Sequence, residues 1–405
     1  MTTSSQTQLT KPAVALHMAM ELSSTTWKLA FSDQLGRNPR VRTIDAGDFV
    51  AMCEEIEATL RVFKLDEDTP VISCYEAGRD GFWIHRSLVA LDIESHIVEP
   101  ASIQVTRKKR RAKTDRIDAE KIVAALIRFK LGDRHACRMI RVPDMESEDE
   151  RHLNREMRTI KAERTAHNNR IKGLLVTQGV TTVAIDRQFV ERLDLYQTPA
   201  GKPLGTRLKE RLTREFERMA LATEQIRRLQ MQQATMIRQA NKEPEGCSPA
   251  AMIAGRLCSL SGIGPVTSWT LSTEIFSWRD ISNRRQLAAL VGLVPTPHSS
   301  GDDEREQGIS KSGRAELRDL MIEIAWGWLR FQPDSELTKW YQRRFDDGTK
   351  RNRKIGIVAV ARKLLVALGK YVRDGEIPAG AKMDGTRKFH YMASLMPRDA
   401  TPKAA

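Results

Sequence analysis

Two kinds of apolar spacing alternate along the first third of the chain. Compact or alternating apolar runs indicate strands, whereas apolar residues three and four positions apart indicate helices. The pattern predicts strands at 14–22, 27–31, 41–44, 70–75 and 96–98, and helices at 47–63, 82–91 and from 115 onward. We therefore predict an α/β domain over residues 13–145. It follows a Ser, Thr and Gln rich stretch at 1–12, which we expect to be a disordered tail.

The predicted order is three strands, helix, strand, helix, strand, helix, which is the order of ribonuclease-H-like (resolvase-like) folds with a mixed sheet. Longer helical patterns follow at 150–176 and 208–236, where apolar residues recur in alternating four- and three-residue steps. Two such helices, joined by a stretch rich in Pro and Gly, predict an antiparallel coiled-coil linker over residues 146–248. A helical bundle packed on its own domain and a self-association arm are both compatible with this pattern.

A mainly helical domain is predicted over residues 249–378, before a loose C-terminal tail at 379–405. Near its start, Gly262 and Gly264 precede a new helical pattern. A Gly-x-Gly turn before a helix offers free backbone N–H groups to a phosphate, as helix-hairpin-helix motifs do against DNA. The alternative is a glycine turn that only lets two helices pack closely.

Charge is concentrated in two places. The chain has 66 Lys and Arg against 52 Asp and Glu, a formal net charge of +14. Residues 101–130 hold ten basic and three acidic residues, and residues 341–373 hold ten and two. Two cationic patches favour nucleic acid as the partner, ahead of an anionic membrane surface. Neither a membrane-spanning apolar stretch nor an N-terminal signal pattern appears, so we expect a cytoplasmic protein without membrane contact.

The five cysteines are odd in number and scattered, which argues against a disulfide framework and a zinc knuckle. A basic run instead marks the first candidate site: Arg107, Lys108, Lys109, Arg110 and Arg111. Asp115 and Asp118 follow it and share one face of the predicted helix. Such paired carboxylates favour Mg²⁺ or Mn²⁺, and a metal beside cations suggests chemistry on phosphate. The alternative is a solvated helix start with acids in its first turn.

Two further acids stand at the ends of predicted strands. Glu21 ends the first strand, and Glu76 follows the fourth. Taken singly, each is an ordinary strand-end acid. Together with Asp115 and Asp118 on a facing helix, they predict a site for two metal ions about 4 Å apart, which activates an attacking oxygen and stabilises the leaving one.

Ser300, which precedes Gly301, is the candidate nucleophile. Lys311, Arg314 and Arg318 are placed to hold a phosphate near it. No base accompanies this serine in a Ser-His-Asp pattern, so chemistry alone leaves a turn residue as the commoner interpretation.

The sequence as a whole resembles the DEDD transposases of the bacterial insertion-sequence family 110/1111, and is closer to the 1111 branch. The motifs that carry the resemblance occur in the family's order over residues 13–375: Met20 to Ser23, Cys74 to Gly78, Lys113 to Ala119, Leu260 to Pro265, Gly292 to Pro295, Ser299 to Gly301 and Ile309 to Gly313. One position departs from the family pattern, because the first acid is commonly aspartate and here is Glu21.

The resemblance implies a transposase that recombines the DNA of its own mobile genetic element. It implies that Glu21, Glu76, Asp115 and Asp118 bind magnesium, and that Ser300, or less favourably Ser299, forms a phosphoserine intermediate with DNA. It also implies a homo-oligomer (dimer or tetramer) with composite sites, a noncoding bridge RNA that selects target and donor DNA, and a nucleoid-associated protein in bacteria. A water-using junction-resolving endonuclease and a non-catalytic nucleic-acid-binding protein are the rival hypotheses.

Overall fold

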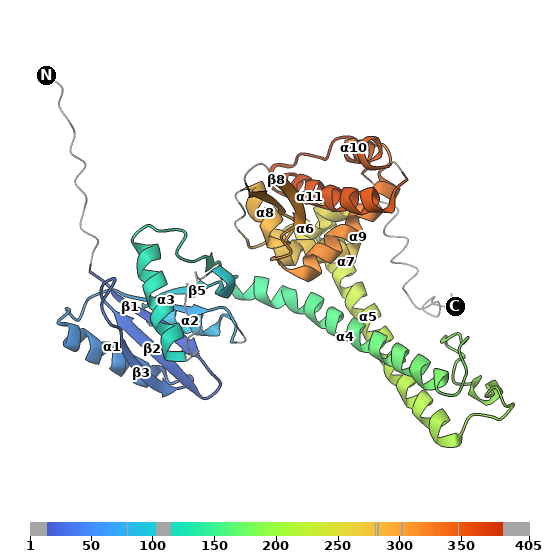
Figure 1. The fold of residues 1–405 in the computed structure, drawn as a ribbon, viewed down its shortest axis with the longest axis horizontal. Helices are drawn as coiled ribbons and strands as arrows, with labels where there is room; N and C mark the ends of the chain where they lie inside the picture. The colour runs from blue at the N-terminus through green and yellow to red at the C-terminus, as the bar shows by residue number, and fades with distance from the viewer. Residues whose placement is uncertain are drawn as a thin grey trace. The chain divides into compact units, whose positions relative to one another are not determined.

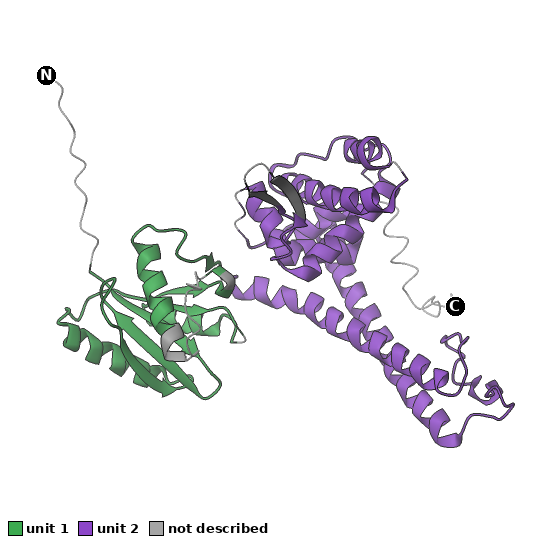
Figure 2. Cartoon of the chain, viewed as in Figure 1, with its two compact units in different colours: residues 1–142 green, residues 143–405 purple. Residues whose placement is uncertain are grey.

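A computed structural model describes residues 14–78, 80–102, 115–279, 281, 283–300, 303–346 and 348–383. The side chains of residues 101, 115–118, 297–300 and 303–307 are outside this description. The predicted tail at 1–12 and the basic run at 107–111 therefore lie outside the described residues, as does 384–405. The chain divides into two compact units, unit 1 (Met1–Val142) and unit 2 (Pro143–Ala405) (Figure 2).

Unit 1 is built on a six-stranded mixed sheet in the order β3-β2-β1-β4-β5-β6. The strands are β1 (Leu16–Leu22), β2 (Thr26–Ser32), β3 (Arg40–Asp45), β4 (Val71–Glu76), β5 (Glu94–Val98) and β6 (Met139–Ile140). Central strand β1 pairs antiparallel with β2 and parallel with β4. The predicted order of strands and helices is the order observed, and the mixed sheet is compatible with a ribonuclease-H-like domain. The short strand β6 was not predicted.

Helices cover both faces of this sheet (Figure 1). They are α1 (Phe49–Phe63), α2 (Trp83–Ala90) and α3 (Asp115–Lys130), with a short 3-10 turn, η1, at Pro100–Ser102. On one face, Met18 and Met20 of β1 share a core with residues of α1 and α2. On the other face, Ala15 and Ala19 share a core with residues of α3. Successive side chains of β1 point to opposite faces, and helices cover both faces, so the strand is buried on both sides. This explains why β1 is apolar along nearly its whole length.

Unit 2 begins with two long helices, α4 (Met145–Val176) and α5 (Thr206–Lys242), which pack antiparallel through apolar residues. A polar contact also joins the two helices, because His167 Nδ1 lies within hydrogen-bond distance, 2.6 Å, of Oε2 of the buried Glu215. The long loop between the two helices contains a short 3-10 helix, η2 (Leu193–Leu195). It has a small core of its own, in which Phe189 is completely buried.

The rest of unit 2 is a mainly helical body around α9 and α11. Its elements are α6 (Pro249–Cys258), α7 (Pro265–Leu271), the π-helix η3 (Ser272–Phe276), α8 (Arg284–Leu290), β7 (Pro295–Ser300), β8 (Asp303–Ile309), α9 (Ala315–Phe331), α10 (Glu336–Phe345) and α11 (Lys350–Asp374). Trp328, Leu364 and Leu368 are completely buried in its core. The hairpin of β7 and β8 was not predicted. Within the described parts of the chain, every helix is too short or too polar to cross a membrane.

The buried His17 and the half-buried His85 make the stability of unit 1 sensitive to acid. Burial lowers the pKa of His17 on β1, and burial together with the neighbouring His96 and Arg86 lowers the pKa of His85 on α2. The folded chain thus favours the neutral imidazoles, whereas the unfolded chain takes up protons near the ordinary histidine pKa of 6.5. We expect the free energy of unfolding to be fully present above this pH and to decrease as pH falls below it.

Urea denaturation monitored by hydrogen exchange of β1 amides, at pH 7.5 and 5.5, measures this effect. Replacement of His17 by leucine should make the pH dependence shallower. An equal loss of stability on acidification in the variant would remove His17 from the explanation.

Candidate functional site

Glu21 and Glu76 are neighbours at one edge of the sheet in unit 1. The parallel register of β1 and β4 pairs Met20 with Tyr75. Glu21 and Glu76 come one residue later on each strand, so they are adjacent where both strands end. Both side chains are half-buried. The fold therefore brings together two acids that lie 55 positions apart in the sequence.

The two acids also share the face that α3 covers. Glu21 lies two residues after Ala19 on β1, and Glu76 lies two residues after Cys74 on β4, so each acid points to the same face of the sheet as that residue. Ala19 and Cys74 both belong to the core shared with α3, and the Cys74 thiol lies 4.0 Å from the carbonyl oxygen of Ile122. Successive side chains of a strand point to opposite faces, so Glu21 and Glu76 stand on the α3 side of the sheet.

Helix α3 runs from this edge toward the opposite one. At its C-terminal end, Lys130 Nζ lies 2.7 Å from Oε1 of Glu94, the first residue of β5. The N-terminal end of α3 is therefore directed toward the edge where β1 and β4 finish. Asp115 and Asp118 lie one turn before Ala119 and Ile122, which are buried against the sheet. The backbone thus places all four predicted acids on one face at one edge, while convergence of their carboxylates remains a prediction.

The donor set at this edge suits a hard divalent cation. Glu21 and Glu76 supply carboxylate oxygens, which Mg²⁺ and Mn²⁺ prefer over nitrogen or sulfur ligands. Where side chains are described, no three His, Cys, Asp or Glu residues gather closely enough to hold a metal ion. The side chains of Asp115 and Asp118 are not among those described. This finding therefore covers Glu21 and Glu76 but does not test the predicted group of four acids.

In unit 2, Ser300 is the last residue of β7 and stands opposite Asp303 of β8 in the antiparallel register. Its side chain lies outside the described part, so its role as nucleophile remains a prediction. The base of the hairpin is held by two backbone hydrogen bonds. Ser310 N donates to Val294 O over 2.8 Å, and Lys311 N donates to Gly292 O over 3.3 Å. Ser300 is therefore carried at the far end of a hairpin whose base is fixed.

Two glycines allow the close crossing at this base. A Cβ added to Gly313 would lie 2.3 Å from the backbone nitrogen of Gly292, which no packed structure tolerates. Gly292 itself has φ +68, a conformation that favours glycine. The predicted phosphate ligand Lys311 lies beside this crossing, is exposed, and also has positive φ.

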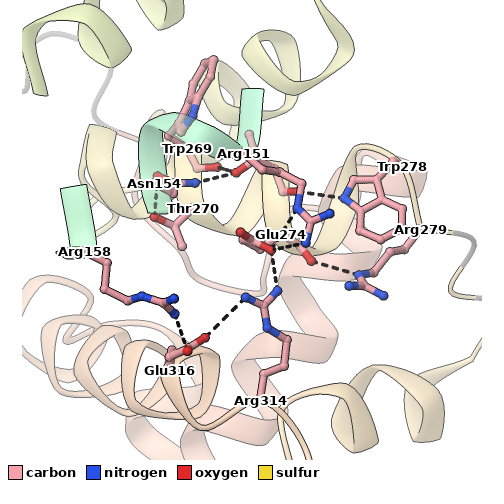
Figure 3. A network of polar contacts seen from close by, with 11 residues as sticks. Arg151, Asn154, Arg158, Trp269, Thr270, Glu274, Trp278, Arg279, Arg314 and Glu316 are labelled. Atoms are coloured by element: carbon pink, nitrogen blue, oxygen red, sulfur yellow. Dashed lines mark hydrogen bonds and ion pairs between the residues drawn. The ribbon is translucent and has the colours of Figure 1, made fainter. Parts of the chain in front are cut away.

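A buried acid joins the hairpin segment to α4 (Figure 3). Glu274, in the π-helix η3, is 3 % exposed. Its Oε2 lies 3.2 Å from Nη2 of Arg151 on α4 and also pairs with Arg314, directly after the glycine crossing. Burial opposes ionisation of Glu274, but Arg314 and Arg151 outweigh it and lower the pKa of its carboxyl. Arg314, predicted as a phosphate ligand, thus also has a structural ion pair.

Neighbouring groups complete this network. Arg151 lies 4.9 Å from the centre of the Trp278 ring, and Asn154 Nδ2 donates to Thr273 Oγ1 over 2.6 Å. Glu316, exposed at the start of α9, pairs with Arg314 and with Arg158 of α4. The result is a chain of polar contacts between α4, η3 and the first turn of α9.

Sequence reasoning did not find this network. Glu274 lies within the apolar-periodic run that includes Trp269, Leu271 and Ile275. A lone carboxylate among such residues signals a buried charge with a distant partner. The pattern cannot identify that partner, because Arg151 is 123 positions away.

The predicted helix-hairpin-helix turn lies between α6 and α7. Gly262 has φ +89, and an added Cβ would lie 3.3 Å from Phe331 Cβ, which supports the role in close packing. Gly264 immediately precedes α7 and borders open space. Contact of either glycine with phosphate remains a prediction.

Comparisons with known proteins agree with this organisation. A DEDD transposase profile of the IS110 type matches residues 38–178, and the profile described as Transposase IS116/IS110/IS902 family matches residues 254–341. Relatives include "Putative transposase y4rJ" of Sinorhizobium fredii, which is 41% identical over 382 residues, covering 91% of this chain and 94% of that protein. The "Transposase for insertion sequence element IS1111A" of Coxiella burnetii is 26% identical over 313 residues, covering 77% and 78%.

The buried pairing of Glu274 generates a stability prediction. Replacing Glu274 by alanine leaves the buried Arg151 without its anion, so we expect a loss of about 3–5 kcal/mol in the free energy of unfolding of unit 2. Glu316→Ala is the matched control, because it removes a half-exposed carboxylate that also pairs with Arg314. It should cost less than about 1 kcal/mol. Urea denaturation measures both, and equal costs would contradict a special role for Glu274.

Proposed function

The chain belongs to the IS110/IS1111 family of insertion-sequence DEDD transposases, and from this we propose that it cuts and rejoins DNA strands with an acidic metal site and a serine nucleophile. Membership of a transposase family implies activity on DNA. The observation that best supports the acidic site is the parallel register that makes Glu21 and Glu76 neighbours on the face of α3. Within this proposal, the mixed sheet of unit 1 is a ribonuclease-H-like nuclease domain.

Glu21, Glu76, Asp115 and Asp118 would hold Mg²⁺ or Mn²⁺. A divalent cation bound there supplies positive charge that polarises the scissile phosphate. The two strand-end glutamates belong to a sheet buried on both faces, so their backbone positions are fixed before DNA arrives. Glutamate in place of the family's usual first aspartate has one more methylene, which gives Glu21 a longer reach from its strand.

Ser300 would attack the scissile phosphorus through its Oγ. The Oγ–P bond forms, with loss of the hydroxyl proton, as the P–O bond to the neighbouring nucleotide breaks, and the departing oxygen takes up a proton, so no net proton is gained or lost. The phosphoserine diester keeps the energy of the broken bond, so rejoining needs no ATP. The tightly held hairpin base, with the Gly292 and Gly313 crossing, supports this role because it limits movement of the strand that carries the serine.

The nucleic-acid partners follow from charge and family membership. The phosphate backbones of double-stranded DNA, at element ends and target, would be contacted by the basic run at 107–111, the turn at Gly262 and Gly264, and the residues Lys311 and Arg314.

A noncoding bridge RNA would select the DNA partners. Two or four copies of the chain would assemble so that acids and serine come from different copies. We place this activity in the bacterial cytoplasm, at the nucleoid.

Replacement of Ser300 by alanine tests the nucleophile. We expect loss of both strand cleavage and the covalent DNA adduct, with duplex binding kept, because only the attacking oxygen is removed. Ser299→Ala is the matched control and should retain the adduct. Denaturing gels followed by mass spectrometry of the DNA-linked peptide give the readout. Continued cutting by Ser300→Ala would indicate water as the nucleophile, and hence an endonuclease.

Replacement of Glu76 by glutamine tests the acidic edge. Loss of a metal-binding charge should lower Mg²⁺-dependent cleavage by at least about a hundredfold. Glu94→Gln, at the opposite edge of the same sheet, should leave cleavage unchanged. Cleavage assays over a range of Mg²⁺ and Mn²⁺ concentrations, with chelator as blank, measure this. A protein that binds DNA but shows no metal-dependent nicking in any variant would be a non-catalytic binding protein.

A further inference from the structure

Unit 2 contains a cavity that the proposed reaction does not use. It has a volume of about 500 Å³ and lies between α10, α11 and the chain segment at 376–379. This volume is within the usual range for sites that hold a small organic group. Its walls are largely apolar, with Trp328, Leu337, Trp340, Val366, Ala367, Pro378 and Ala379 among the lining residues. We call it the Trp340 pocket.

Hydrogen bonds fix the walls of the Trp340 pocket. The indole N–H of the buried Trp328 donates to Ser335 Oγ over 2.9 Å, and this serine caps α10. The backbone N–H of Glu336 donates to the carbonyl oxygen of Ala379 over 3.0 Å, which holds the segment at 376–379 against the start of α10. The cavity is therefore formed by well-packed chain before any ligand enters.

The pocket is also lined by three cations, Arg343, Lys363 and Lys370, and by two acids, Glu336 and Glu376. Lys370 pairs with Glu376 over 3.3 Å, so its charge is partly offset. Arg343 and Lys363 are exposed, and neither has an acidic partner among the described residues. Lys363 Nζ instead lies 4.6 Å from the centre of the Trp340 ring. Positive charge and an aromatic ring thus meet in the lining of one largely apolar cavity.

We propose that the Trp340 pocket binds one unpaired nucleotide of a single-stranded segment. The base would enter the apolar cavity beside Trp340, and the flanking phosphates would contact Arg343 and Lys363. Aromatic rings with adjacent cations are how proteins hold single strands, since every base has a flat face and every linkage a negative charge. This inference rests on the proposed function only in that the chain acts on nucleic acid.

The pocket favours a single strand over a duplex for a geometric reason. In a duplex each base is stacked between its neighbours, so it cannot enter a cavity without being extruded. The surrounding surface also suits a polyanion, because residues 341–373 carry ten basic and two acidic residues. Unpaired DNA and unpaired RNA share the chemistry that the pocket recognises.

Binding of three probes by full-length protein tests the inference: 12-nucleotide oligothymidylate, 12-nucleotide oligouridylate and duplex DNA of an element end. Trp340→Leu should weaken single-strand binding about tenfold, because stacking on one base is lost. It should leave duplex binding within about twofold. Trp326→Leu is the matched control, since Trp326 is 41% exposed on α9 and does not line the pocket. If Trp340→Leu weakens binding of oligothymidylate more than binding of oligouridylate, the natural ligand of the pocket is DNA, and the reverse result identifies RNA.

A second variant covers the case in which Trp340→Leu misfolds, because Trp340 packs edge-on against Phe345 at 5.4 Å. Arg343→Gln combined with Lys363→Gln changes only exposed side chains. It should weaken single-strand binding and reduce the salt dependence by about 1.4 in log K against log salt. Arg351→Gln combined with Lys354→Gln is the control, because it removes two exposed cations of α11 that do not line the pocket.

Two results would overturn the inference. These are unchanged single-strand binding in the pocket variants and an equal loss in the control variants. Each is read while duplex binding and cleavage by the unaltered protein persist. Absence of duplex binding and cleavage in the unaltered protein would instead count against the proposed transposase function.

Discussion

The parallel pairing of β1 with β4 determines where the two strand-end acids of unit 1 lie. A shift of this register by one residue would move Glu76 to the opposite face of the sheet from Glu21. The register is held because β1 is buried on both faces, with Met18 and Met20 on one side and Ala19 on the other. A slip would place the bulky methionines where only alanine fits against α3. The packing of the core thus keeps the two acids side by side.

A different constraint governs unit 2. The buried carboxylate of Glu274 needs two guanidinium partners, and these come from α4 and from the segment that follows the serine hairpin. Removal of Glu274 would leave the buried Arg151 without its anion in a low-dielectric interior, which is far more costly than a lost surface pair. The long helix α4 and the start of α9 are therefore held together by an interaction that tolerates little change. Arg314 serves this network whether or not it also contacts phosphate.

Under the proposed function, the two units would divide the tasks of a nucleic-acid enzyme. Unit 1 presents acids at a sheet edge, where backbone positions are rigid and carboxylates can face a cation. Unit 2 carries the serine on a hairpin and, on α10 and α11, exposed cations beside an aromatic cavity. Rigid positioning suits metal chemistry, whereas a basic surface suits the recognition of long polyanions. The family relationship and these separate features support the same general function.

Local patterns in the sequence were enough to predict much of this protein. Apolar periodicity predicted the order of strands and helices in unit 1, because alternation and helical spacing are properties of neighbouring residues. Glu21 and Glu76 could be chosen as candidate metal ligands from one sequence, because each stands at the end of a predicted strand. The motifs also predicted the transposase family, which the similarity to known transposases confirms.

Tertiary structure decided what depends on contacts between distant residues. The β7 and β8 hairpin escaped prediction because its strands are polar and lack alternation, with Asp303, Glu304 and Arg305 opening β8. Glu274 required Arg151 from another helix, and the Trp340 pocket required α10, α11 and the segment at 376–379 to meet. No local spacing encodes such encounters, because burial and long-range pairing arise only when the chain has folded.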